Sequence, residues 1–427
     1  MFKRIFSSSP LYYNVVWRLM LDVFSRGSFF FLNVLIARRL GVTEFGKFGY
    51  AVSVVQIFYI FTELGTHLQL IKEQGEKRGK NEKAWKDFFE LKLALMGCCL
   101  ILFIFLCTFI WHWENPWLLL VALFWMFGNS ILDFNQFVCN GLGRMDLARR
   151  QLLIQRGFLI AIVLGTLSFI PTLKGVMVGM AVGAILGALV SNIYFYQVND
   201  LHLSFSPDFK EWKRILLASI PNGIGGAFGS WYLRMGAVIL AWLWSSRDVG
   251  EYSAAFRIYE TTYLIPAGIM SVSVPHLAEA LQEGPARFRK ELLRLSGMVL
   301  PMALIWTLFL YFGSTQIIER LYGAGFAGAV PVLRVLAFVS GTVFVNYFVT
   351  HVMIVISRQR RHALHEAIVF LLNLVFSVYL IPDRASTGAA IALLLTELSL
   401  FTLTTGYLLI QWHSASRKPG YATINSR

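Results

Sequence analysis

Apolar windows alternate with short charged or glycine- and proline-rich joints along almost the whole chain. A helix needs about 20 residues, at 1.5 Å per residue, to cross roughly 30 Å of hydrocarbon. The windows predict about twelve such helices, near residues 12–37, 45–70, 89–111, 116–139, 152–171, 175–197, 213–244, 249–274, 291–312, 330–356, 363–381 and 386–411. We therefore expect an all-α, polytopic membrane protein.

Composition and charge agree with this interpretation. The chain is 56% hydrophobic and only 15% charged, with a mean hydropathy of +0.61, whereas soluble domains are about 25% charged. The net charge of +14 does not indicate a nucleic-acid partner, because the basic residues lie in short loops between spans. These spans put 26 of the 38 Lys and Arg residues on the side of the termini and seven on the other. Basic loops stay in the cytoplasm, so both termini are expected there.

The first predicted span carries charges on one face. In "WRLMLDVFSRGSFFFLNVLIARR" (17–39), Arg18, Asp22 and Arg26 follow each other at intervals of four, which puts them on one helix face. Charged residues inside membranes almost always face a bundle interior or a water-filled cavity, so we expect this stripe to face a central cavity. Alternatives stay open, since Arg18 could snorkel to the cytoplasmic surface and Asp22 could either neutralise its neighbours or couple transport to an ion.

Other predicted spans also carry charges. Arginine suits a lipid phosphate, because its planar guanidinium binds two oxygens at once and does not lose its proton. The candidate ligands of an anionic headgroup are Arg18, Arg26, Arg234, Arg257 and Arg334. The candidates for ion coupling or charge balance are Asp22, Glu63, Asp133, Glu260 and Glu397. Arg257 and Glu260, three residues apart, could equally form a plain structural ion pair.

Nothing in the sequence indicates an enzyme or a primary pump. There is no G-x-x-x-x-G-K-[ST] loop for ATP, no catalytic constellation and no cluster of metal ligands. We expect no catalytic residue, no metal and no cofactor, and a proton or sodium gradient as the source of energy.

Two short matches indicate an internal duplication. "FGKFGYA" (45–51) pairs with "VGEYSAA" (249–255), and "GVMVGMAVG" (175–183) pairs with "GAAIALLLT" (388–396), at offsets of 204 and 213 residues. Two six-helix lobes, 1–198 and 199–427, are therefore expected, related by a pseudo-two-fold axis along the membrane normal. The seventh span contains "SIPNGIGGAFGSWYLRMG" (219–236). Its small residues predict either a bending helix or close helix packing.

Several segments in order carry a family resemblance over nearly the whole chain. They are "ARRLGVTEFGKFGYA", "NGLGRMDLA", "VGEYSAAFRIYETTYLIPAGIMSVSVPHLA", "LYGAGF" and "GAAIALLLTE". In these segments the chain resembles the polysaccharide flippases of the multidrug/oligosaccharidyl-lipid/polysaccharide exporter superfamily. One departure concerns the seventh span, where Met235 and Gly236 follow Arg234 at the place where many relatives have an Asp.

The resemblance implies a V-shaped cationic cavity between two lobes and transport by alternating access. The implied substrate is an undecaprenyl-diphosphate-linked oligosaccharide of the O-antigen type, moved to the outer leaflet of a bacterial inner membrane. Membrane lipids and a polysaccharide polymerase of the same pathway are the other implied partners.

Two alternatives stay open at this stage. A drug or cation antiporter of the same superfamily would favour buried acids over intramembrane arginines. A membrane O-antigen polymerase or ligase, which is an enzyme, would have a long external loop, and the predicted external loops are all short.

Overall fold

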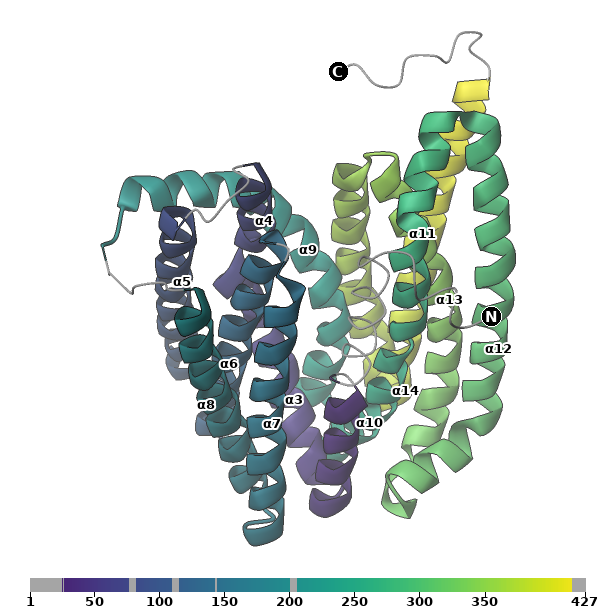
Figure 1. Ribbon diagram of the computed structural model, residues 1–427. Helices are drawn as coiled ribbons and strands as arrows, with labels where there is room; N and C mark the ends of the chain where they lie inside the picture. Colours follow the sequence, from purple (N-terminus) through teal and green to yellow (C-terminus); the bar gives the residue numbers. More distant parts are fainter. Residues whose placement is uncertain are drawn as a thin grey trace, which may run out of the picture.

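The computed structural model describes Ser25 and residues 27–76, 82–109, 115–142, 144–199 and 206–416. Within these residues the chain is helical, with no strand (Figure 1). A helical segment at 27–40 precedes α3 (Val42–Glu63), α4 (Thr66–Glu76), α5 (Glu82–Phe109), α6 (Pro116–Gly141), α7 (Met145–Phe169), α8 (Leu173–Asn199), α9 (Phe209–Leu243), α10 (Ser246–Thr261), α11 (Leu264–Glu283), α12 (Pro285–Leu321), the 3₁₀ turn η1 (Ala324–Phe326), α13 (Ala329–Val355) and α14 (Gln359–Ser416).

Among the described residues, nine helical stretches are long and apolar enough to cross a membrane. The stretch at Val42–Glu73 joins α3 to α4 and the stretch at Ser246–Glu283 joins α10 to α11, so two predicted spans are interrupted helices. Conversely, α14 contains both of the last two predicted spans, which meet at a sharp kink at Ala385 (φ 48°, ψ −130°). The protein is thus a multi-pass, all-α membrane protein, as predicted. The predicted span 12–37 lies largely outside the described residues.

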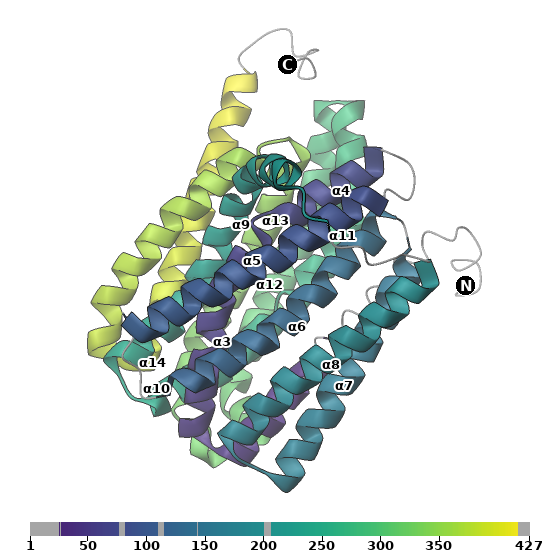
Figure 2. The same ribbon diagram turned by 90° about the vertical axis from the view of Figure 1, so that its left-hand side faces the viewer.

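The helices form two groups. Helices α3 to α8 lie together on one side of Figure 1 and α10 to α14 on the other. Helix α9 begins across the top of the first group and then turns to run between the two. In the perpendicular view of Figure 2, α7 and α8 lie side by side as an antiparallel pair on the edge of the first group. These groups are the two predicted lobes, although the predicted boundary between 198 and 199 stays a prediction.

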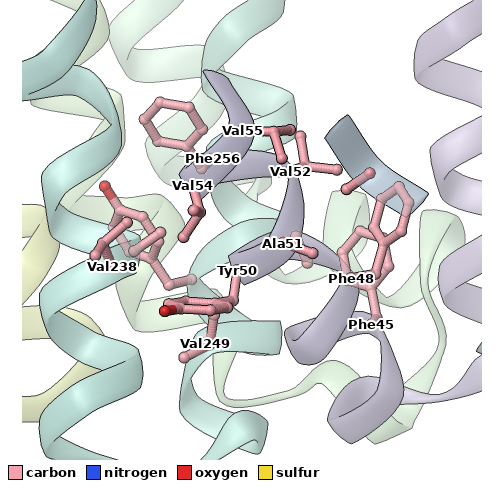
Figure 3. Packing of buried hydrophobic residues seen from close by; sticks show 14 of the residues in the cluster. Phe45, Phe48, Tyr50, Ala51, Val52, Val54, Val55, Val238, Val249 and Phe256 are labelled. Atoms are coloured by element: carbon pink, nitrogen blue, oxygen red, sulfur yellow. The ribbon is translucent and has the colours of Figure 1, made fainter. Parts of the chain in front are cut away.

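The lobes pack together where α3 and α10 begin. Buried apolar side chains of α3 meet Val238 of α9 and Val249 and Phe256 of α10 (Figure 3). Phe45 of α3 also lies edge-on to Phe326 of η1, with 6.0 Å between ring centroids. At the same end, the Nε of Arg38 donates to the carbonyl oxygen of Leu321 (2.6 Å), which satisfies an otherwise unpaired group at the end of α12. This contact region joins the first lobe to the second.

Two glycines make equivalent contacts across this junction. A Cβ on Gly46 would overlap the carbonyl oxygen of Ser246 and lie 2.8 Å from the nitrogen of Gly250, and a Cβ on Gly250 would overlap the carbonyl oxygen of Val42. Ser246 precedes Gly250 by four residues, as Val42 precedes Gly46. Such reciprocity is the property of a two-fold interface. The two halves are therefore related by a pseudo-two-fold axis at this contact, as the duplication predicts.

A second close contact involves the seventh predicted span. Leu64 and Gly65 end α3 with positive φ angles of 42° and 79°, and Gly65 lies against α9. A Cβ on Gly223 would lie 2.7 Å from the nitrogen of Gly65. At Gly223, therefore, a small residue allows two backbones to touch, which is the close-packing alternative raised by the sequence.

Candidate functional site

An Arg–Glu–Arg cluster lies between α9 and α10. Arg234 donates from Nη2 to Oε1 of Glu260 (2.7 Å), and Arg257 donates from Nη1 to Oε2 of the same carboxylate (2.7 Å). The guanidinium of Arg234 also lies 5.3 Å from the ring centroid of Phe256, a cation–π distance. The three charges sum to +1. Each guanidinium has five N–H donors and Glu260 takes one from each, so the cluster keeps donors for an anion.

The sequence left open whether Arg257 and Glu260 form a plain structural ion pair, and the structure answers this in part. Arg257 and Glu260 do form an ion pair, as their spacing allowed, but Arg234 from another helix shares the carboxylate. The side chains of Arg234, Arg257 and Glu260 are 18%, 9% and 26% exposed. Glu260 is thus the most exposed of the three side chains.

Glu397 on α14 is a buried acid held by neutral donors. It accepts hydrogen bonds from the hydroxyl of Tyr232 on α9 (3.0 Å) and from Nδ2 of Asn346 on α13 (2.6 Å). Glu397 is 1% exposed. No Lys, Arg or His nitrogen of the described chain forms an ion pair with it. Its charge is therefore balanced by dipoles, or neutralised by a bound proton or cation.

A second ionic cluster lies in the first lobe, around the end of α3. Glu63 forms a buried ion pair with Lys92 of α5, and its other oxygen lies 3.0 Å from Nδ1 of His67 on α4. The hydroxyl of Tyr59 lies 2.7 Å from Oδ2 of Asp133 on α6 and 3.2 Å from Oε1 of Glu63. The two predicted acids, Glu63 and Asp133, are thus brought together through one tyrosine.

The remaining predicted residues lie elsewhere. Arg334 is on the exposed face of α13, where its Nε donates to the hydroxyl of Ser314 on α12 (3.1 Å). It has no contact with Arg234 or Arg257 among those that the structure describes. Arg18, Asp22 and Arg26 lie outside the described residues.

Two basic residues that were counted among the 26 on the side of the termini, Lys92 and Arg156, lie within the predicted spans 89–111 and 152–171 and belong to helix interiors. Lys92 is 2% exposed within α5, and Arg156 lies in α7 with its guanidinium 5.6 Å from the ring centroid of Phe29. Both residues lie near the start of an apolar window, where the boundary between loop and span is not sharp. For Lys92, the apolar run "FFELKLALMG" (88–97) already surrounds the lysine and was the available signal. The uncharged partners Tyr59, Tyr232 and Asn346 gave no signal in the sequence.

No group of three or more His, Cys, Asp and Glu residues in the described part of the chain could hold a metal ion.

Comparisons with known proteins agree with the fold. Residues 11–281 match the family described as polysaccharide biosynthesis protein. A search of curated proteins gives no match.

Solved structures of two kinds are similar to this one. One is the lipid II flippase MurJ in an inward closed conformation, with a TM-score of 0.69 and 15% identity over 94% of this chain and 93% of that chain. Another is a multidrug resistance MATE family transporter of the MOP superfamily in an inward-facing conformation, with a TM-score of 0.67 and 14% identity over 92% of this chain and 96% of that chain. An outward-facing MATE transporter of the MOP superfamily gives a TM-score of 0.62 and 12% identity over 95% and 97%.

At these identities the structural likeness establishes the two-lobed fold, and the family match covers well over half of the sequence. The chain therefore belongs to the polysaccharide biosynthesis protein family.

Proposed function

We propose that this protein flips a polyprenyl-diphosphate-linked oligosaccharide across the membrane by alternating access. The substrate would be an undecaprenyl-linked glycan of the O-antigen type, moved from the cytoplasmic to the outer leaflet of a bacterial inner membrane. No enzymatic step is needed, and a polymerase of the same pathway would use the product. The observation that carries the proposal is the Arg234–Glu260–Arg257 cluster within a membrane-spanning member of this family.

The chemistry of the headgroup explains why arginines are needed. A diphosphate carries two negative charges through a medium of low dielectric constant, where an unpaired charge is very costly. Guanidinium groups bind phosphate oxygens through parallel N–H donors and stay charged when buried. The diphosphate would compete with Glu260 for the donors of Arg234 and Arg257. Arg18 and Arg26 would supply further positive charge from the first lobe.

The packing of the lobes supports alternating access. The lobes touch where α3 and α10 begin, and the distribution of basic residues predicts that this end faces the outside. A headgroup entering from the cytoplasm would then reach the arginines while the outer end is closed. Separating the helices at Gly46 and Gly250 would open that end.

A binding measurement tests the proposal directly. Purified protein in detergent is titrated with undecaprenyl diphosphate, and the bound lipid is followed by native mass spectrometry. A hydrogen bond to a charged group is worth about 1.5–3 kcal/mol, so Arg257→Ala should weaken binding by roughly 10- to 100-fold. Arg257→Lys should restore part of it, because lysine supplies a charge without the fork.

The control is Arg287→Ala, which changes an exposed arginine paired with Glu283 on the surface. This variant should bind the lipid as the unchanged protein does. Equal binding by Arg257→Ala and the unchanged protein would contradict the proposal. The acid Glu397, which has no basic partner among the described residues, favours a cation antiporter as the second candidate. Tight binding of an organic cation together with no binding of the diphosphate lipid would support that candidate.

A further inference from the structure

Three side-chain oxygens lie in a row in the first lobe. They belong to Asp133, Tyr59 and Glu63, and the phenol oxygen of Tyr59 is 2.7 Å from the first carboxyl group and 3.2 Å from the second. A phenol has one proton to donate. Shared between two ionised carboxylates, that proton makes two weak hydrogen bonds, whereas a proton on one of the carboxyl groups allows each oxygen–oxygen contact its own hydrogen bond. The row therefore has a place for one additional proton.

The charges around the row say which acid takes it. Glu63 is paired with Lys92 and contacts His67, so its ionised form is compensated. Asp133 forms no ion pair within the described residues, and the charges of Lys92 and of Arg156 on α7 act on it only from a distance. An uncompensated carboxylate in an apolar surrounding becomes neutral by binding a proton. Asp133 and Tyr59 are half-buried, whereas Glu63 and Lys92 are buried, so the proton would enter from the side of Asp133.

We propose that Asp133, Tyr59 and Glu63 form a proton-binding site of the first lobe, with Asp133 as the residue that binds and releases the proton. Tyr59 positions Asp133 and links it to Glu63, and Lys92 holds Glu63 ionised. This proposal rests on the proposed transport function only in naming its coupling ion. A sodium ion is disfavoured, because the ammonium group of Lys92 lies directly against Glu63 and would repel a cation.

The site lies next to a joint between the lobes. Glu63 is the last residue of α3, directly before the left-handed Leu64, and Gly65 then touches Gly223 of α9. A change of charge at the site therefore acts on the helix end that contacts the second lobe. If one arrangement of this joint binds the proton more tightly than another, proton binding is coupled to movement of the lobes.

Infrared difference spectroscopy of the protein in lipid vesicles tests the site without any transport assay. The spectrum is recorded as the pH is raised, and the carbonyl band of a protonated carboxylic acid is followed. We expect Asp133→Asn to remove a titrating band that is present in the unchanged protein. Asp133→Glu should retain a band at a shifted frequency, and Glu63→Gln should retain the band of Asp133. Tyr59→Phe should move its midpoint by about one pH unit or more to higher pH, because the ionised carboxylate loses a hydrogen bond.

The control is Asp146→Asn, which changes an exposed acid in the first turn of α7 and should leave the titrating band in place. The proposal is overturned if the band survives in Asp133→Asn, if Glu63→Gln alone removes it, or if sodium at constant pH displaces it. A titrating Asp133 in a protein that moves no lipid-linked glycan would keep the site and reject the transport function. Transport of the glycan by a protein in which Asp133 does not titrate would reject the proton site and keep the transport function.

Discussion

Gly49 and Ser253 hold equivalent positions in the two halves of the chain and touch each other. They are 204 residues apart, the offset that relates the segments 45–51 and 249–255, and a Cβ on Gly49 would lie 2.8 Å from the Cβ of Ser253. The neighbouring pair Gly46 and Gly250 has the same offset and lies one turn earlier on the same two helices. Contact between equivalent residues in the same order along both helices means that α3 and α10 run parallel. The pseudo-two-fold axis therefore runs along these helices and passes between them.

The closeness of α3 and α10 predicts a large effect of a single methyl group. Gly46→Ala should destabilise the protein by about 1–3 kcal/mol, the usual cost of overpacking, because its Cβ would overlap the backbone of Ser246. Gly165→Ala is the matched control, since no atom lies within 4 Å of the Cβ position in its helix. It should be neutral or stabilising. Thermal unfolding in detergent measures both, and equal midpoints would show that the helices do not touch there.

A cross-link at the axis should stop the transport cycle. Cysteines at positions 49 and 253 need only a small separation of the helices to reach the Cβ distance of about 3.8 Å that a disulfide requires. We expect oxidation of the Gly49→Cys, Ser253→Cys protein to block flux and reduction to restore it. Each single variant should be insensitive to oxidation. Full flux by the cross-linked protein would mean that this end of the molecule never opens.

The buried Lys92 predicts a strong effect on stability. Lys92→Met leaves Glu63 without its ammonium partner, and removal of one member of a buried ion pair typically costs about 3–5 kcal/mol. The double variant Lys92→Met, Glu63→Gln should be more stable than the single one, because no unpaired charge remains. Denaturation in detergent gives the two values. A double variant that is less stable than Lys92→Met would show that the pair does not act as a unit.

The orientation in the membrane follows from the basic residues and can be tested in cells. In a background without cysteines, Lys174→Cys at the start of α8 should react with an impermeant thiol reagent. Lys290→Cys on α12 should not, because its loop is predicted to lie in the cytoplasm. Both side chains are exposed, so burial does not explain a difference. The opposite labelling pattern would invert the orientation.

The fold could be predicted from the sequence because membrane spans leave a long apolar signature. Interruptions inside spans were not predictable from it. The break at Leu64 lacks any proline, whereas the kink at Ala385 falls in the joint between the predicted spans 363–381 and 386–411, where the sequence does predict a break. The break at Leu64 depends on what packs against it, as the contact of Gly65 with Gly223 shows.

The site was predictable in its charges and less so in its partners. Spacing within one helix linked Arg257 to Glu260, whereas Arg234, which lies 26 residues before Glu260, was joined to them only by the fold. Lys92 lies within the predicted span 89–111, and it was counted with the loop residues because an apolar window has no sharp edge. Tyr59 and Tyr232 are ordinary aromatic residues in apolar runs, and only their contacts with Asp133 and Glu397 give them a role.

We propose that Arg234 of α9 and Arg257 of α10 carry a lipid diphosphate across the membrane. The flux of undecaprenyl-diphosphate-linked oligosaccharide in reconstituted vesicles tests this proposal, measured by the accessibility of the glycan to an external glycosidase. The unchanged protein should move the lipid, the Arg234→Ala, Arg257→Ala variant should lose at least tenfold of the rate, and Arg287→Ala should keep it. Full flux by the double alanine variant, or no flux by the unchanged protein, would contradict the account.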